Sequence, residues 1–274
     1  MNKFIVLGLI LFGIPKVFAQ ADDLNTQLMF STFKISNPKS SATVFILNRP
    51  APNAPDKTQS ILITAAHVLE GMEGNDATLI LRKKFGDGEY EKAPMTLKIR
   101  DGGKAIWTKH PTEDVAVMLV SLPPGIEPPC LSTDILATDE SLKTAGVHPG
   151  QTIRCAGYPH ASQFNPSAAG FPLIRIGCIA SFPLLPTSKT KTFLIDLNTF
   201  EGDSGAPVYI VDESVPTIEI KERRGLMLIG LVHGQHFLDE NFKTIYQSGQ
   251  TKHRLGIGII VHATAIKTAI GLLP

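Results

Sequence analysis

The 274-residue sequence has few cysteines, no excess of charge of either sign and no long hydrophobic run beyond its N-terminal region. The 26 basic and 25 acidic side chains leave a formal charge of +1, which gives no electrostatic reason to expect nucleic acid as a partner. No later apolar run is long enough to span a bilayer, so we expect no stable membrane insertion. No group of residues has metal-ligand spacing, and no metal is expected.

The cysteines are Cys130, Cys155 and Cys178, so at least one of them has no partner within the chain. Cys155 and Cys178 each lie in a strand-like run, Thr152–Cys155 and Ile174–Ile179. On neighbouring strands they could face each other and form a disulfide. They could equally be two small buried hydrophobic residues, and the sequence leaves both alternatives open.

What the chain does contain is typical of a globular protein made of short strands. Hydrophobic residues make up 43% and charged residues 19% of it, which excludes a disordered chain. The 20 prolines and 23 glycines are many turn-forming residues, and they favour short strands joined by loops over long helices. The length suits one large domain or two small ones.

The N-terminus has the pattern of an export signal over residues 1–21. Lys3 supplies the positive charge, Phe4–Ile14 is an apolar run of 11 residues, and small residues follow up to Ala21. Cleavage after Ala19 and cleavage after Ala21 fit equally well. A membrane anchor is the alternative, but the apolar run is short for a bilayer. We therefore expect a secreted or periplasmic protein.

Strand-like runs are the main feature of the remaining chain, and they fall into two series. A proline-rich connector at 122–134 separates them, so residues 22–121 and 135–274 are predicted to form two antiparallel β-barrels of about six strands each. A short helix is predicted over His262–Leu272 from its helical spacing of apolar residues. The expected strands are Ala42–Leu47, Ser60–Thr64, Ala77–Leu81, Met95–Ile99, Val115–Val120, Gln151–Cys155, Leu173–Ala180, Thr192–Leu197, Ala206–Val211, Leu226–Val232 and Gly256–Val261.

The segment Gly202–Pro207 (GDSGAP) has the pattern of a nucleophile loop. Ser204 lies between Gly202 and Gly205, and glycines let the backbone turn sharply while a substrate carbonyl approaches closely. The backbone N–H groups of Gly202 and Ser204 are the natural donors for a developing oxyanion. A serine hydroxyl alone is a poor nucleophile, so this pattern requires a base elsewhere in the chain.

His67 and Asp114 are the best candidates for the base and for the carboxylate that orients it. His67 follows the apolar strand Ile61–Ala66, and Asp114 directly precedes another, Val115–Val120. The order His, Asp, Ser along the chain is that of a chymotrypsin-type triad. With the first two residues in one half and Ser204 in the other, the site is predicted to lie between the barrels.

These motifs resemble the chymotrypsin/trypsin-like serine peptidases, in their disulfide-poor bacterial branch. The resemblance implies a double β-barrel, an acyl-enzyme mechanism, hydrolysis of peptide bonds in a polypeptide substrate, and no cofactor. The matching segments are Thr64–His67, Asp114–Val117, Gly157–Pro159, Gly202–Pro207 and Ile229–Gly234.

The resemblance also implies which residues bind the substrate. The backbone of His233, Gly234 and Gln235 would pair with the extended peptide. Asn198, followed by Thr199, takes the position at the bottom of the specificity pocket, so the acidic group needed for Lys or Arg specificity is missing. A neutral polar pocket is expected, and either His233 or Thr199 could favour an acidic side chain. Alternatively, His233 bonds near Asp114 or fills space.

Two other classes of serine hydrolase fit the sequence less well. Lipases and esterases with a Gly-Asp-Ser segment have it near the N-terminus and an Asp-x-x-His near the C-terminus, whereas here the segment begins at Gly202 and no histidine has an aspartate three residues before it. The nucleophile elbow of the α/β-hydrolases, Gly-x-Ser-x-Gly, needs glycine at the position of Ala206. The remaining alternative is a secreted trypsin-fold binding module without catalytic activity. No Ile-Val-Gly-Gly activation sequence follows a basic site, so insertion of a new N-terminus against Asp203 is not expected.

Overall fold

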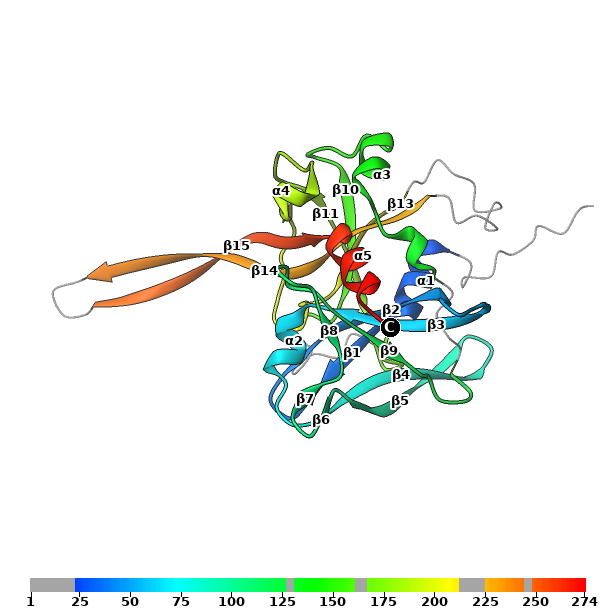
Figure 1. Cartoon of the computed structure of the whole chain (residues 1–274). Helices are drawn as coiled ribbons and strands as arrows, with labels where there is room; N and C mark the ends of the chain where they lie inside the picture. The colour runs from blue at the N-terminus through cyan, green and yellow to red at the C-terminus, as the bar shows by residue number, and fades with distance from the viewer. Residues whose placement is uncertain (1–22, 127–130, 161–166, 212–224, 244–247) are drawn as a thin grey trace, which may run out of the picture.

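A computed structural model describes residues 23–126, 131–160, 167–211, 225–243 and 248–274 of the chain. Strands dominate, short helices lie at the surface, and the chain forms two β-units packed against each other (Figure 1). The predicted all-β fold class is confirmed. The predicted signal peptide at residues 1–21 and Cys130 lie outside the described residues.

The first β-unit is a seven-stranded antiparallel sheet with the order β5-β4-β1-β2-β3-β9-β8. In its central strand β2, successive side chains from Ser41 to Leu47 are all buried, so both faces of this strand are covered by the protein. This sheet has one strand more than the six expected for the first barrel, because the two-residue β8 adds to β9. The strands are β1 (Thr32–Ser36), β2 (Ser41–Ala51), β3 (Ala54–Thr64), β4 (Asp76–Gly86), β5 (Glu89–Lys98), β8 (Thr108–Lys109) and β9 (Ala116–Val120), and β6 (Arg100–Asp101) pairs separately with β7 (Lys104–Ala105).

The second β-unit is a closed barrel of six antiparallel strands in the order β10-β11-β12-β15-β14-β13. Closure leaves no free edge in the body of this unit. Two of its strands continue far beyond the barrel as a hairpin that projects from the molecule (Figure 1). The strands are β10 (Thr152–Gly157), β11 (Leu173–Ile179), β12 (Thr192–Asp196), β13 (Pro207–Val211), β14 (Leu226–Lys243) and β15 (Ser248–His262).

The helices are short, and the predicted C-terminal one is present. It packs on the second unit and also reaches the first, because the Arg49 guanidinium of β2 donates to Ile270 O at 3.1 Å and to Pro274 O at 2.8 Å. In the part of the chain described, no helix combines the length and hydrophobicity needed to cross a membrane. The helices are α1 (Leu24–Ser31), α2 (Ala66–Gly71), α3 (Asp139–Thr144), α4 (Thr187–Thr190) and α5 (Ala263–Gly271), with a 3-10 turn η2 (Thr133–Ile135).

The two described cysteines are free thiols. They lie on the neighbouring strands β10 and β11 but not opposite each other, because Cys155 pairs with Arg175 and Cys178 pairs with Thr152. Burial raises the pKa of the Cys155 thiol to about 12, so this side chain is an inert part of the core at neutral pH. Of the two alternatives that the sequence left open, the structure has the one without a disulfide.

A buried histidine, His262, is expected to make the fold less stable in acid. His262 is 2% exposed, its Nδ1 has no partner among the described residues, and its Nε2 lies 3.2 Å from Thr190 Oγ1. Burial lowers the pKa of His262 from 6.5 to about 4, although the nearby Asp139 carboxylate opposes this shift. Between pH 6.5 and 4 the unfolded chain therefore binds a proton that the folded protein excludes.

We expect this histidine to cost about 3 kcal/mol of unfolding free energy as the pH falls from 6.5 to 4, since one pKa unit corresponds to about 1.4 kcal/mol. Urea unfolding at pH 7, 5.5 and 4 measures the loss, and His262→Gln, which keeps a polar group without the titration, should lose less. Equal losses in the two proteins would show that other groups cause the acid sensitivity.

Candidate active site

Strand pairing brings His67 and Asp114 together. β3 and β9 are antiparallel neighbours, with Thr64 opposite Ala116. His67 follows the end of β3 in the first turn of α2, and Asp114 directly precedes the buried Val115 that leads into β9. Both side chains therefore lie at the same end of the sheet.

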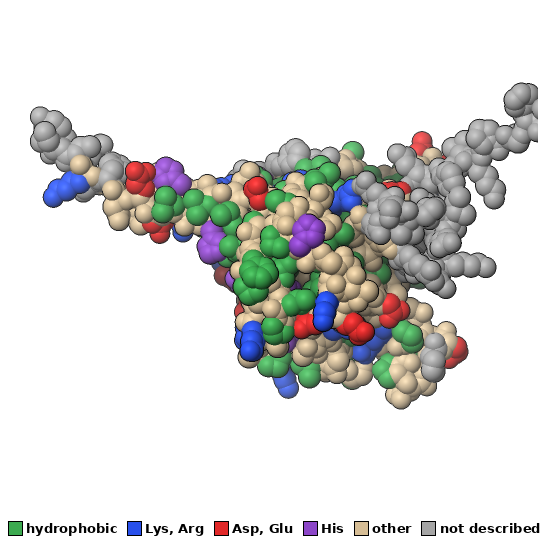
Figure 2. Space-filling view, turned by 90° about the horizontal axis from the view of Figure 1, so that it is seen from above, with side chains coloured by type: hydrophobic (Ala, Val, Ile, Leu, Met, Phe, Trp, Pro, Cys, Tyr) green, Lys and Arg blue, Asp and Glu red, His purple; other side chains and the backbone are tan. Residues whose placement is uncertain are grey.

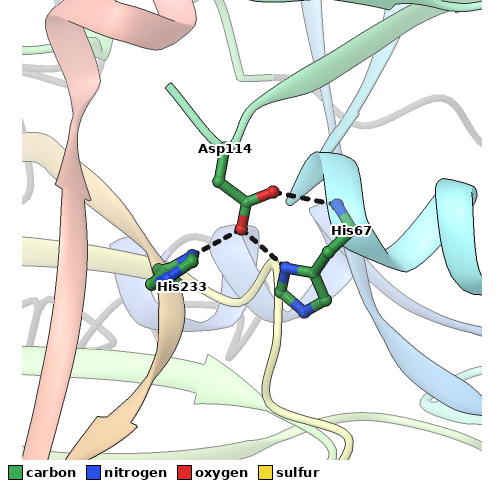
Figure 3. Close-up of side chains that lie close together, drawn as sticks. All are labelled: His67, Asp114 and His233. Atoms are coloured by element: carbon green, nitrogen blue, oxygen red, sulfur yellow. Dashed lines mark hydrogen bonds and ion pairs between the residues drawn. The ribbon is translucent and has the colours of Figure 1, made fainter. Parts of the chain in front are cut away.

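His67 lies between Asp114 and Ser204. Its Nδ1 is 2.6 Å from Asp114 Oδ2, and its backbone N–H donates to Asp114 Oδ1 at 2.8 Å (Figure 3). On the other side of the ring, its Nε2 is 2.9 Å from Ser204 Oγ. Because a carboxylate only accepts, Nδ1 carries the proton and Nε2 is left as an acceptor for the Ser204 hydroxyl. The three residues thus have the connections of a nucleophile, a base and an orienting carboxylate.

Asp114 also accepts a hydrogen bond from a second histidine. His233 of β14 places its Nδ1 2.5 Å from Asp114 Oδ2, and its ring meets that of His67 edge to face at 5.8 Å (Figure 3). Burial alone would raise the pKa of Asp114, but the hydrogen bonds from His233 and His67 outweigh it and hold that pKa well below its usual range. The hydrogen bond to Asp114 in turn raises the pKa of His233. Asp114 is therefore a carboxylate at neutral pH.

His67, Asp114 and His233 also form a group whose possible metal-ligand atoms all lie within 4.8 Å of one another. The two N···O separations, 2.6 and 2.5 Å, are those of hydrogen bonds. Ligand atoms about 2.0 to 2.1 Å from a tetrahedral zinc ion lie about 3.3 Å apart, so the group would have to open to hold one. Its present geometry is that of a hydrogen-bond network.

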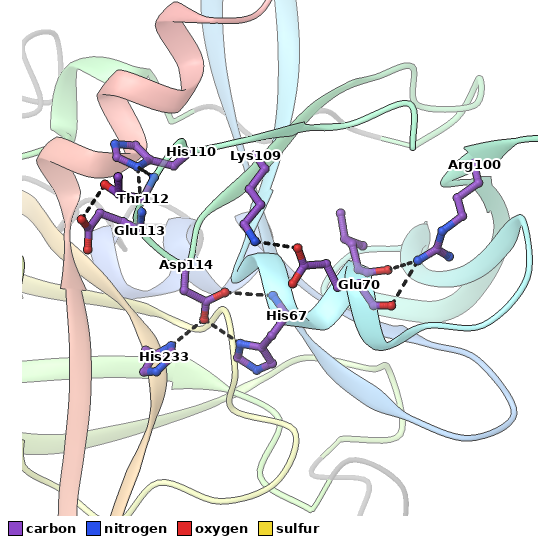
Figure 4. A network of polar contacts seen from close by, with 10 residues as sticks. His67, Glu70, Arg100, Lys109, His110, Thr112, Glu113, Asp114 and His233 are labelled. Atoms are coloured by element: carbon purple, nitrogen blue, oxygen red, sulfur yellow. Dashed lines mark hydrogen bonds and ion pairs between the residues drawn. The ribbon is translucent and has the colours of Figure 1, made fainter. Parts of the chain in front are cut away.

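The loop and the helix that carry Asp114 and His67 are held by polar contacts (Figure 4). His110 Nδ1 accepts from the backbone N–H groups of Thr112 and Glu113 at 3.2 and 2.9 Å, which closes the turn before Asp114. At the end of α2, the Arg100 guanidinium donates to several backbone carbonyls, among them Leu69 O at 2.6 Å. A cation at a helix C-terminus is favourable both to the free carbonyls and to the helix dipole.

The nucleophile loop is fixed against the first β-unit. Thr43 of β2 donates its N–H to Ser204 O at 3.0 Å and its hydroxyl to Gly202 O at 2.7 Å, and its Oγ1 accepts from Tyr158 N at 3.2 Å. Gly205 has φ +84°, and a Cβ there would collide with Thr64 Oγ1 and Thr43 O. Only glycine fits this position, because both the backbone conformation and the close approach exclude a side chain.

The two amides predicted to form an oxyanion hole remain available. Neither the N–H of Gly202 nor that of Ser204 has a hydrogen-bond acceptor among the described residues. Asp203, between them, is fully buried and turns inward, where its Oδ2 accepts from Phe200 N at 2.7 Å. The loop thus leaves these two amides unpaired among the described residues, while its one carboxylate is buried.

Arg175 on β11 is the partner of this buried carboxylate, and sequence reasoning missed it. Its Nη2 lies 2.6 Å from Asp203 Oδ1, and its Nη1 donates to Asn198 O at 2.7 Å, so one guanidinium holds both ends of the loop. Burial raises the pKa of Asp203, and Arg175 opposes that shift. The only sequence signal was an arginine in the otherwise apolar run Ile174–Ile176.

No protein-family model and no curated relative matches the chain. Among solved structures it is similar to the inactive form of the Rv3671c protease of M. tuberculosis, at 18% identity and a TM-score of 0.45 over 89% of each chain. It is also similar to a human pathogenic astrovirus serine protease (14% identity, TM-score 0.42, 85% of this chain and 90% of that one). A third similar structure is the thermostable serine protease AL20 from an extremophilic microorganism (13% identity, TM-score 0.43, 89% of this chain and 96% of that one). Likeness at this level indicates neither activity nor specificity, and both depend on this chain's own geometry.

A pocket of about 460 Å³ opens beside Ser204. Of the residues predicted to bind substrate, Thr199, Gly234 and Gln235 line it, whereas Asn198 and His233 do not. Asn198 is exposed, and its side-chain oxygen faces Gly256, while the His233 ring is bound to Asp114. The pocket is lined by Thr199, Phe200, Glu201, Ser204, Val232, Gly234, Gln235, Phe237 and Arg254.

Proposed function

We propose that this chain is an exported serine endopeptidase that hydrolyses peptide bonds through an acyl-enzyme. One observation carries the proposal. Ser204 Oγ lies 2.9 Å from the unprotonated Nε2 of His67, and Asp114 fixes the opposite nitrogen of the same ring at 2.6 Å. Nothing in ordinary core packing requires a serine, a histidine and a carboxylate in this order beside an open pocket.

The residues act in two half-reactions. Ser204 Oγ attacks the scissile carbonyl carbon while His67 Nε2 takes its proton, and the carbonyl oxygen becomes an oxyanion facing the N–H groups of Gly202 and Ser204. The protonated His67 gives its proton to the leaving amine as the C–N bond breaks. Water then loses a proton to His67 and attacks the acyl carbon, and Ser204 recovers its proton as the acid product leaves.

Asp114 remains a carboxylate throughout and stabilises the positive charge that forms on His67. The hydrogen bonds from His233 and from the His67 backbone keep this carboxylate ionised and oriented. The substrate is a polypeptide in extended form, whose backbone lies along the segment His233–Gln235. Export rests on the signal pattern in residues 1–21.

The non-catalytic binding module is the second candidate, and one experiment separates the two. A fluorophosphonate probe reacts when an activated serine oxygen attacks phosphorus and displaces fluoride. We expect the purified wild-type protein to be labelled and Ser204→Ala to remain unlabelled. Ser121→Ala, which removes an exposed serine at the end of β9, is the matched control and should be labelled like the wild type.

Equal labelling of wild type and Ser204→Ala would exclude Ser204 as the nucleophile. A folded wild-type protein without any label would leave the binding module as the better proposal. Secretion into the medium or the periplasm with loss of 19 or 21 residues, measured by mass spectrometry of the exported protein, tests the signal peptide separately.

A further inference from the structure

The outer parts of β14 and β15 form a hairpin that projects from the molecule (Figure 1), and its first residues line the pocket beside Ser204. The pairing of the two strands is irregular between Gln235 and Phe237, and beyond this bulge Phe237 pairs with Arg254. Directly paired residues of an antiparallel ladder point to the same face, so these two side chains lie together. Both line the pocket beside Ser204. The first pair of the hairpin thus belongs to the wall of the candidate active site.

Arg254 is the one cation among the residues that line this pocket. Its guanidinium lies over the Phe200 ring, 5.0 Å from the ring centre, and among the described residues no carboxylate forms an ion pair with it. Arg175 lies on the same ring at 5.9 Å, but its guanidinium is engaged by Asp203 and Asn198 O. Phe200 therefore positions Arg254 while leaving its N–H donors unused.

The pocket lining also carries one negative charge, which is not paired with Arg254. Glu201 is the one anion of the lining, and its exposed side chain forms no ion pair with Arg254 within the described residues. Farther along the hairpin, Lys252 lies over Phe237 at 4.6 Å, with Asp239 directly opposite it in the ladder. Figure 2 shows from above that the hairpin carries charged and hydrophobic side chains side by side.

Uncharged donors complete the lining. The Thr199 hydroxyl donates to Gly234 O at a long 3.3 Å, and Gln235 contributes a carboxamide. A carboxylate can accept from the Arg254 guanidinium and from the Gln235 carboxamide, whereas a lysine or arginine side chain would meet the like charge of Arg254. His233, which the sequence offered as a candidate for acidic specificity, is instead engaged with Asp114.

We propose that this pocket selects an acidic side chain, glutamate or aspartate, on the substrate residue whose carbonyl Ser204 attacks, with Arg254 as its charge partner. The inference rests on the proposed peptidase function and names its substrate class. Arg254 is then the specificity-determining residue, and the hairpin is part of the substrate-binding cleft.

Four peptide substrates that differ only at this residue, carrying Glu, Gln, Leu or Lys, test the proposal. We expect the wild-type protein to have the highest kcat/KM for the Glu peptide. Arg254→Gln should lower kcat/KM for the Glu peptide by about 10- to 100-fold, the range for loss of a hydrogen bond to a charged group, while the Gln peptide changes little. Arg254→Lys, which keeps the charge, should recover part of the loss.

Two matched variants separate charge from structure. Lys252→Gln removes a cation on the same face farther from Ser204 and should have a smaller effect than Arg254→Gln. Glu201→Gln removes the one anion of the lining and should raise kcat/KM for the Glu peptide. Thermal unfolding of each variant shows whether it is folded.

The opposite outcomes are clear. A wild-type preference for the Lys peptide would show that Glu201 sets the charge of the pocket and would overturn the proposal. An equal loss on all four peptides in Arg254→Gln would assign this residue a structural role instead. If the fluorophosphonate labels Ser204 but the wild-type protein does not prefer the Glu peptide, only this inference is overturned. If Ser204 is not labelled, the proposed peptidase function is overturned as well.

Discussion

Ser204→Ala should lower kcat for peptide hydrolysis by about 10⁶-fold, the effect of removing the nucleophile in a serine peptidase with the same triad. The alanine leaves the pocket and the backbone amides in place, so KM should change far less than kcat. Steady-state kinetics on one peptide substrate measures both constants.

The control for this loss is Ser121→Ala, which should retain the wild-type kcat. A fall of less than about 10-fold in Ser204→Ala would mean that another group attacks the substrate. The same measurement on His67→Ala should give a loss of similar size, because the serine and its base act as one unit and their effects do not add.

Arg175→Met should give the second large effect, on stability and on catalysis together. It leaves Asp203 buried without its cation, and breaking a buried ion pair in this way costs about 3 to 5 kcal/mol of unfolding free energy. Asp203 would then be driven toward solvent, and the loop from Asn198 to Ser204 would lose its arrangement. If one oxyanion donor is lost with it, kcat should fall by about 10²- to 10³-fold.

The double variant Arg175→Met/Asp203→Asn distinguishes the charge from the shape of the site. It removes both charges, so urea unfolding should show part of the stability restored relative to Arg175→Met. Wild-type stability and wild-type fluorophosphonate labelling in Arg175→Met would show that the hydrogen bonds from Thr43 and Phe200 hold the loop without the ion pair.

Most strands of the fold could be predicted because they are local features of the sequence. Runs such as Ile61–Thr64 and Leu226–Val232 combine β-branched residues with bounding turn signals, and both of these lie within strands. The hairpin beyond Val232 could not be predicted in the same way. Its β14 arm, residues 233–243, is mostly polar and lacks β-branched residues, and its strand form depends on the partner strand.

The site shows the same division. Ser204, His67 and Asp114 stand in short motifs whose residue types carry the chemistry, and the structure brings these three within hydrogen-bond distance. Arg175 and Arg254 stand in no motif. The positions of their guanidinium groups depend on contacts with Asp203 and Phe200, which are 28 and 54 positions away in the sequence, and only tertiary structure reveals such contacts.

The position of Thr43 gives the proposed catalytic site a further property. This residue belongs to the first β-unit, yet its N–H and hydroxyl hold the carbonyls of Ser204 and Gly202, which belong to the second. The proposed nucleophile, Ser204, therefore stays aligned with its proposed base, His67, only while the two units are docked. In a state in which the two units have separated but each keeps its strands, the far-UV circular dichroism would be that of a folded protein while peptide hydrolysis would be lost. On heating, loss of activity should therefore precede the unfolding of either unit.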